Sequence, residues 1–540
     1  MTALGPILLA ASLGAPTAFF VACFFSRLRP AALALQWLAP IPALLAAIAA
    51  LASGPFDLEA PALKLILRLD LPAALLLAVS ALLWIAVGAG AFLDRAERPE
   101  PRAALCWLLT MIGSLGVFVA DDLLSFYLVY ALVSIPAYGM FAFDPSPATL
   151  RAGRVYMAFA ILGEAFLLFA FAMLAAGEPH GSLRIPDVVA ALPMSPWRDA
   201  ALALLVAGFG AKMGLVPLNG WMPLSYAATP IPAAAVLSGA GVKAGVIGLI
   251  RFLPLGTPLA GWGEGLAAVG FATAFYGVVV GATQPNPKAI LAYSSVSQMG
   301  VIAAALGMAL AAGEARAPPL VAFYAANHVL VKGALFLTVG AFAARGTRAT
   351  AWTLLAVALA LSLAGLPFTG GALAKAASKP LFGSGLAASL AAASSAMSAL
   401  LMLRFVSRLP HAGEYDAAAS PARLVRAWPW TAVGALLLPC LLFPFVGDLA
   451  DALSLSKLWE GLWPVLAGGA LALGLARIAD RVPRIPPGDT IVVGEAAFDR
   501  LLGLSALFER IEAVFSRWPA AGLALLAIVL ALVYATPHVG

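Results

Sequence analysis

Charged residues are scarce in this sequence. Asp, Glu, Lys and Arg make up only 11% of its 540 residues, whereas a typical soluble domain contains about 25%. Hydrophobic residues make up 63% of the chain, and the mean hydropathy is +0.98. This balance excludes a soluble globular protein and predicts an all-α polytopic membrane protein, because runs of roughly twenty apolar residues span a bilayer as helices. The net charge of +6 comes from Lys and Arg in short loops, so it does not indicate nucleic-acid binding.

Cysteine is also rare. The three cysteines, Cys23, Cys106 and Cys440, lie in apolar runs, and no two of them have CxxC spacing. We interpret them as small packing residues. The chain has neither the glycine motif of a dinucleotide-binding fold nor a pair of histidines spaced as haem ligands. We therefore expect no cofactor and no metal on this chain, and any electron transfer would belong to other subunits.

Long apolar runs occupy most of the sequence, and we expect about sixteen membrane-spanning helices with short connections. The first run has no basic segment ahead of it, so we expect a retained span and not a cleaved signal peptide. Apart from four lysines inside spans, twenty-eight Lys and Arg lie in or beside loops, and twenty of these belong to loops that follow odd-numbered spans. This asymmetry predicts cytoplasmic odd loops and outward termini. The Ala-, Leu-, Gly- and Arg-rich composition fits a GC-rich bacterium, hence its inner membrane. The runs lie near residues 5–25, 33–52, 71–93, 103–119, 123–143, 154–176, 200–217, 231–250, 264–282, 289–311, 319–343, 351–382 (interrupted), 386–403, 430–447, 461–476 and 519–536.

One long stretch, residues 485–518, does not span. Its apolar residues recur at three- and four-residue spacing, and its charged residues take other faces. This pattern predicts an amphipathic helix that lies at the membrane surface or against a partner subunit. A helix that only covers its own bundle is the alternative.

The prediction of function depends mainly on residues 208–251, where a proline-rich joint separates two apolar helical segments. The two segments carry one lysine each, Lys212 and Lys243. A lysine near the bilayer centre costs about 2.5–3.5 kcal/mol, so it normally faces protein or water and marks an ion or proton route. Broken helices at membrane depth are tolerated only where the backbone is buried in protein or lines a cavity, as in transporter sites. The joint between the segments contains four prolines, Pro217, Pro223, Pro230 and Pro232.

Ionisable residues inside other spans extend this route. Burial makes a lysine release its proton more easily, and a carboxylate that approaches the lysine reverses the effect. His328 and Lys332 lie four residues apart in NHVLVKG, so they share one helix face, and histidine relays protons at neutral pH. We predict a proton pathway over a purely structural role for this set. The set comprises Glu164, Lys212, Lys243, His328, Lys332 and Lys375.

A second interrupted span, LAGLPFTGGALAK at 363–375, again ends in a lysine. Two broken spans of this kind suggest two structural repeats of inverted topology, although Pro367 and the glycines also fit ordinary loop chemistry. Another span, around Tyr293 and Gln298, has a polar stripe. Its hydroxyls and amides fit either a water wire or hydrogen bonds between helices.

Four segments carry a resemblance to a known family. They are 211–252 (AKMGLVPLNGWMPLSYAATPIPAAAVLSGAGVKAGVIGLIRF), 286–307 (NPKAILAYSSVSQMGVIAAALG), 327–337 (NHVLVKGALFL) and 363–375. The chain resembles the antiporter-like, proton-translocating subunits shared by respiratory complex I, Mrp-type Na⁺/H⁺ antiporters and membrane-bound hydrogenases, over a core of roughly residues 70–410.

The resemblance implies about fourteen core helices in two inverted five-helix repeats with helices 7 and 12 broken, and about two extra C-terminal helices. We accordingly expect N-terminal helices at 1–102, repeats at 103–255 and 256–410, and C-terminal helices with the amphipathic segment at 411–540. The roles it implies are a central lysine at Lys212, a connecting lysine at Lys243, a central polar axis at His328 and Lys332, and an outlet lysine at Lys375.

One departure from the family concerns the fifth helix. The family usually has a Trp-Glu pair there, whose glutamate partners the lysine of helix 7. Here FYLVYALVSIPAYG (126–139) has Tyr130-Ala131 at that place. Glu164, on the next helix, is the only nearby carboxylate inside a span. We hypothesise that Glu164 has taken over the role, and the alternative is a degenerate half that does not pump.

The sequence therefore predicts a proton-translocating subunit of a multisubunit respiratory or hydrogenase-type membrane complex. The expected partners are other membrane subunits, the lipid bilayer and protons, with Na⁺ as an alternative ion. One alternative is an Mrp-type antiporter or proton-driven uptake subunit without redox chemistry. The other is a non-pumping membrane scaffold, favoured only by the missing acid of the fifth helix.

Overall fold

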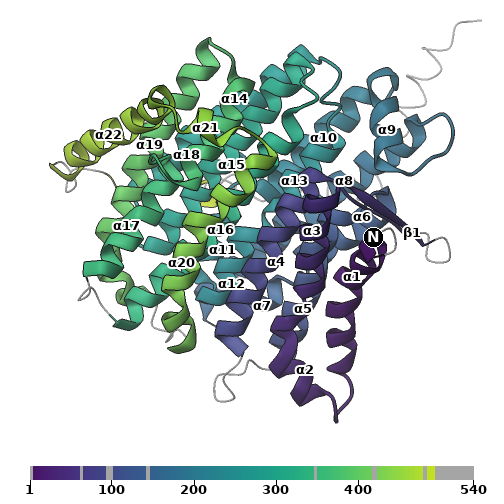
Figure 1. Cartoon of the computed structure of the whole chain (residues 1–540), viewed down its shortest axis with the longest axis horizontal. Helices are drawn as coiled ribbons and strands as arrows, with labels where there is room; N and C mark the ends of the chain where they lie inside the picture. The colour runs from purple at the N-terminus through teal and green to yellow at the C-terminus, as the bar shows by residue number, and fades with distance from the viewer. Residues whose placement is uncertain are drawn as a thin grey trace, which may run out of the picture. The chain divides into compact units, whose positions relative to one another are not determined.

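The computed structural model describes residues 4–60, 65–92, 101–141, 146–345, 350–415, 422–477, 483 and 485–492 (Figure 1). Residues 1–487 form one compact unit and residues 488–540 another. Fifteen of the sixteen predicted runs fall within the described residues, and each contains helix. Thirteen helices there are long and apolar enough to cross a membrane, which confirms the polytopic all-α prediction. The span at 519–536 and residues 493–518 of the amphipathic segment lie outside the described residues.

The helices follow one another with short connections (Figure 1). Their bounds are α1 Leu4–Ala22, α2 Arg29–Leu35, α3 Ile41–Ser53, α4 Leu71–Phe92, α5 Pro101–Val119, α6 Leu123–Ser134, α7 Tyr138–Phe141, α8 Pro147–Gly177, α9 Ile185–Ala191, α10 Arg198–Met213, α11 Trp221–Ala228, α12 Ile231–Val236, α13 Lys243–Phe252, α14 Ala260–Ala282, α15 Pro287–Ala312, α16 Ala317–Arg345, α17 Thr350–Ala364, α18 Gly370–Ser378, α19 Leu386–Arg408, α20 Ala422–Leu442, α21 Leu449–Ala452 and α22 Leu455–Arg477.

A short β-hairpin interrupts the helical order between α3 and α4. Strands β1 (Phe56–Ala60) and β2 (Leu65–Leu69) pair antiparallel, with Leu58 opposite Leu67. The all-α prediction missed this hairpin. Its apolar and polar residues alternate along β1 with the two-residue period of a half-buried strand. That signal was present in the sequence, but it is much shorter than a membrane span.

Both predicted helix breaks are present. The first separates α10 from α11 at residues 214–220, and the second separates α17 from α18 at residues 365–369. Gly214 and Gly365 follow the two preceding helices with φ of +72° and +98°, a conformation that side-chain-bearing residues rarely adopt. The Trp221 indole nitrogen donates to the carbonyl of Ala211 (2.8 Å), so one carbonyl freed by the first break is satisfied inside the protein. The inverted-repeat relation between the halves, and the domain borders at 102, 255 and 410, stay predictions.

Helix α16 is the buried centre of the bundle (Figure 1). It packs against α4, α12, α15, α18 and α20, and almost all of its apolar part is buried inside the protein. A helix covered on all sides by other helices does not contact lipid, so polar side chains on it face protein. His328 and Lys332 lie on this helix and are fully buried.

Helices α14 and α15 approach each other closely along a row of glycines spaced seven residues apart. Gly263, Gly270 and Gly277 on α14 face the α15 backbone, and Gly300 and Gly307 face back. A Cβ atom at Gly270 would lie 2.4 Å from the Ala304 nitrogen and 2.7 Å from the Gly300 carbonyl oxygen. Small residues of this kind let membrane helices pack backbone to backbone.

Replacing Gly270 with alanine should therefore push α14 away from α15. Overpacking a tight contact costs about 1–3 kcal/mol, and we expect a melting temperature several degrees lower when thermal unfolding is followed in detergent. Gly265→Ala is the matched control, because no atom lies within 4 Å of a Cβ placed there. That control should be neutral or slightly stabilising, since alanine favours helix over glycine. Equal melting temperatures for the two variants would contradict the close packing.

Candidate functional site

A close crossing of α8 and α10 brings the first two candidate residues together. A Cβ atom at Gly208 would lie 2.7 Å from the Leu167 side chain and 3.0 Å from the Gly163 carbonyl oxygen, so the backbones are nearly in contact there. Glu164 follows Gly163 on α8, and Lys212 lies one turn beyond Gly208 on α10. The crossing therefore places a carboxylate and an amine on neighbouring helices at the same level.

Lys212 points toward hydroxyl groups in a small and mostly apolar pocket. Its amine donates to the Ser134 hydroxyl (2.9 Å) and, at 3.5 Å, to the Tyr156 hydroxyl. The amine also lies 5.9 Å from the ring centroid of Tyr130 and 5.7 Å from that of Tyr156, within cation–π range. Lys212 is 8% exposed. Its position in the last turn of α10 suits a cation, because the end of a helix carries partial negative charge.

Glu164 is 7% exposed and lies beside Lys212 without a direct ion pair between them. Its carboxylate interacts electrostatically with Lys212 and with Ser134. The Oε1 atom is buried and has no hydrogen-bond partner. Tyr130 and Ser134, on α6, reach Lys212 directly, whereas Ala131 offers no acid. The structure thus places the substituted fifth-helix segment against Lys212 and brings Glu164 to the same amine.

Lys243 and His328 form the central contact of the site. The Lys243 amine lies 2.7 Å from Nδ1 of His328, and both residues are fully buried. Lys243 begins α13, one residue after a π-helical turn at Leu237–Gly241, and its amine also reaches the Ser238 carbonyl (3.5 Å). Such turns are frequent at functional sites. The other ring nitrogen, Nε2, is buried without a partner.

Lys332 continues the row on α16. With Tyr324 and His328 it forms a stripe at four-residue spacing, as the sequence predicted for the last two. The Lys332 amine donates to the Leu291 carbonyl of α15 (2.8 Å). Lys332 lies close enough to Lys243 and His328 for their charges to interact. The three groups therefore form one buried cluster.

The polar stripe of α15 connects this region to α19. The Tyr324 hydroxyl donates to Gln298 Oε1 (2.7 Å), and Gln298 Nε2 donates to the Ser398 hydroxyl (3.0 Å). These are hydrogen bonds between helices, one of the two readings that the sequence left open. Ser297 on the same stripe has a buried hydroxyl without a partner. The other interpretation, a chain of water molecules held by this stripe, stays a prediction.

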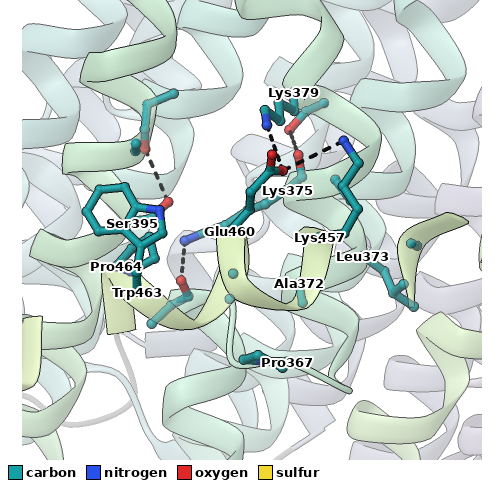
Figure 2. A pocket seen from close by; sticks show the side chains of 18 of the residues that line it. Pro367, Ala372, Leu373, Lys375, Lys379, Ser395, Lys457, Glu460, Trp463 and Pro464 are labelled. Atoms are coloured by element: carbon teal, nitrogen blue, oxygen red, sulfur yellow. Dashed lines mark hydrogen bonds and ion pairs between the residues drawn. The ribbon is translucent and has the colours of Figure 1, made fainter. Parts of the chain in front are cut away.

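Lys375 lies apart from the central cluster, in the wall of a cavity of about 480 Å³ (Figure 2). Its amine donates to the Ala364 carbonyl, which the second helix break has freed at the end of α17. Tyr324 and Ser398, which hydrogen-bond to Gln298 of α15, line the same cavity. These hydrogen bonds therefore lead from α15 to the cavity that contains Lys375. At the mouth, Glu460 of α22 pairs with Lys379 (2.6 Å) and with Lys457 (3.7 Å) (Figure 2).

Sequence reasoning missed several polar residues of the site. Ser134, Tyr156 and Tyr324 are single polar residues in apolar runs, and only their contacts mark them. Lys288 immediately precedes the predicted span 289–311, yet it is 3% exposed and its amine donates to the Thr229 carbonyl (2.9 Å) at the joint of α11 and α12. Within the described ranges, no group of three His, Cys, Asp or Glu side chains is placed to hold a metal ion.

Comparison with known proteins shows what the chain is similar to. The family model for "NADH:quinone oxidoreductase/Mrp antiporter, TM" matches residues 120–403. Hydrogenase-4 component B of Escherichia coli K12 is 31% identical over 243 residues, which cover 43% of this chain and 36% of that protein. NADH-quinone oxidoreductase subunit N of Desulforudis audaxviator is 33% identical over 262 residues, which cover 47% of this chain and 51% of that protein.

The fold has a counterpart among solved structures. A chain of the Mrp complex from Dietzia sp. DQ12-45-1b superposes with a TM-score of 0.74 at 20% identity, covering 99% of this chain and 64% of that one. The matched region spans about a third to a half of the two curated relatives. More than half of the present sequence, including both broken helices and all six candidate residues, lies in the region matched by the family model. The chain therefore belongs to the NADH:quinone oxidoreductase/Mrp antiporter family of membrane subunits.

Proposed function

We propose that this chain carries protons through the membrane along the buried polar groups described above. The observation that supports the proposal most directly is the 2.7 Å contact between Lys243 and His328 at the centre of the bundle. It joins a lysine of the first predicted repeat to a histidine of the second. Two proton-bearing groups in direct contact, both shielded from lipid, are what a transfer step requires.

The proposed route has three sections. Glu164 and Lys212 form the first, Lys243, His328 and Lys332 the second, and Lys375 with its cavity the third. Between the second and third, the hydrogen bonds of the α15 stripe supply polar groups. Water molecules would complete the gaps, because the unpartnered atoms of Glu164 and His328 call for polar partners in a buried site.

The Glu164–Lys212 pair would act as a switch. A buried amine holds its proton tightly when a carboxylate is close and loosely when it moves away. The flexible stem of lysine lets the amine move between the carboxylate and the Ser134 and Tyr156 hydroxyls. A change in a partner subunit that opens or closes the pair would then drive the proton toward Lys243.

We further propose that the chain works in a multisubunit complex in a bacterial inner membrane, with both termini outward. The curated relatives are a component of hydrogenase-4 and a subunit of NADH-quinone oxidoreductase, and the structural neighbour belongs to an Mrp complex. Any redox reaction would take place on other subunits. Na⁺ exchange, as in an Mrp-type antiporter, or proton-driven uptake is the second candidate function, favoured by the extent of the Mrp superposition.

Proton flux in proteoliposomes tests the proposal against a scaffold role. Lys212→Ala should reduce flux by at least about tenfold, because proton-transfer groups commonly contribute factors of about 10² or more. Arg198→Ala is a matched control, since it removes a cation from the partly exposed first turn of the same helix. Equal flux in the wild type and Lys212→Ala would favour the scaffold. Replacing the H⁺ gradient by an Na⁺ gradient distinguishes the two transport functions.

A further inference from the structure

A second cavity, away from the proposed proton route, is lined by two arginines that have no side-chain partner among the residues that the structure describes. It has a volume of about 350 Å³ and lies between α14, α19 and α22. Arg404 and Arg408 of α19 both line it, together with Thr283 and Ser407. Figure 1 shows α19 and α22 side by side, and these two helices pack against each other.

The two guanidinium groups are unusual because no described carboxylate pairs with either of them. In the part of the chain that the structure describes, neither side chain has an ion pair or a hydrogen bond, and both Nε atoms are buried without a partner. The groups lie close enough to repel each other. The end of α19 supplies at most about half a unit of negative charge. Both side chains are partly exposed, but buried polar atoms normally have partners, so the two buried Nε atoms call for a hydrogen-bond acceptor.

We propose that this cavity binds the phosphate headgroup of an anionic membrane lipid. Guanidinium groups bind phosphate through paired, charge-assisted hydrogen bonds. Arg404 and Arg408, one helical turn apart, present two such groups to one space, and the hydroxyls of Thr283 and Ser407 add further hydrogen-bonding groups. Basic pockets between membrane helices on the cytoplasmic side are suited to acidic lipid headgroups.

The walls of the cavity favour a lipid over free phosphate. Leu473 and Leu475 of α22 line it, and Leu473 is 70% exposed on the outer surface of the bundle. Small residues, Gly469, Ala472 and Ala476, leave a groove along α22 beside the arginines. An acyl chain attached to a bound phosphate would lie on this apolar surface. The cavity is also at the ends of α14, α19 and α22 that the count of basic residues assigns to the cytoplasm.

Lipid retention tests the proposal independently of transport. The full chain is reconstituted in phosphatidylcholine bilayers doped with phosphatidylglycerol, and the lipids bound after extraction are counted by native mass spectrometry. We expect the wild type to retain phosphatidylglycerol in preference to phosphatidylcholine, and Arg404→Gln/Arg408→Gln to bind it at least about tenfold more weakly. The control Arg154→Gln/Arg426→Gln removes two exposed arginines from the same predicted side of the membrane and should bind like the wild type.

Three results would overturn the proposal. They are equal retention by the cavity and control variants, equal binding of both lipids by the wild type, and displacement of phosphatidylglycerol by excess inorganic phosphate, which would indicate a site for free phosphate. If the glutamine variant does not fold, Arg404→Lys/Arg408→Lys keeps the charge but loses the paired geometry. That variant should still bind phosphatidylglycerol more weakly than the wild type does.

Discussion

Glu164→Gln is expected to abolish proton transport as completely as Lys212→Ala. Glutamine preserves the shape of the side chain but neither ionises nor releases a proton. Because Glu164 is the carboxylate that interacts with Lys212, and Ala131 supplies none, the substitution leaves the amine without an acidic partner. The expected loss of flux is at least about tenfold, in line with the effect of removing a proton-transfer group.

Proteoliposome flux, with thermal unfolding as a check on folding, decides this prediction. Glu264→Gln makes the same chemical change on an exposed face of α14 and should leave flux unchanged. Glu164→Asp keeps the carboxylate but shortens its reach, so partial activity is expected. Near-normal flux in folded Glu164→Gln would refute the switch. If Lys212→Ala were also active, the first half of the chain would not pump.

The broken helices could be predicted because the signal for them is local. Proline removes a backbone donor, and glycine is suited to the positive φ at the end of a helix, so PLNGWMP and GLPFTGG predict breaks without knowledge of the fold. Predicting the partner of Lys212 required more than a local sequence signal. Glu164 was a candidate because it is ionisable inside a span, but only the absence of an acid at Ala131 indicated that it partners Lys212, and the structure supplies the reason for the proximity in the Gly163–Gly208 crossing.

Other contacts depend on tertiary packing that the sequence does not encode locally. Lys288 follows Asn-Pro at the start of α15, where a surface lysine is the usual expectation, yet its amine folds inward to Thr229. The π-helical turn before Lys243 lies inside a continuous apolar run, and the sequence of that run predicts one uninterrupted membrane-spanning helix. The sequence also does not predict the order in which the proposed proton route connects its groups. Lys375 is connected to the other groups through Tyr324 and Ser398, which line the same cavity.

Lys243→Met and His328→Leu should each reduce proton flux by at least about tenfold. A contact of 2.7 Å between an amine and an imidazole nitrogen holds one hydrogen bond, so one group donates and the other accepts. If the amine donates, the proton of the neutral ring lies on Nε2, the atom that has no protein partner. If the ring donates, the amine is neutral. Either arrangement passes a proton only while both groups are present.

The double variant separates a transfer step from two independent contributions. Two groups that act as a unit give a double variant no worse than either single variant, whereas independent groups give multiplied losses. We expect the flux of Lys243→Met/His328→Leu to equal that of the single variants. His411→Leu, which removes an exposed histidine paired with Glu414, should retain wild-type flux.

The outcome also bears on the two predicted repeats. Lys243 lies in the first and His328 in the second, and the two residues meet only because α16 is surrounded by helices from both halves. If the double variant loses the product of the two single effects, the two groups contribute independently and no direct transfer between Lys243 and His328 is required. If the two halves conduct in parallel, each single variant loses only the share of the flux that its own half carries. If the losses do not multiply, one proton path crosses the junction between the halves, and a change at Lys212 must affect the protonation of His328.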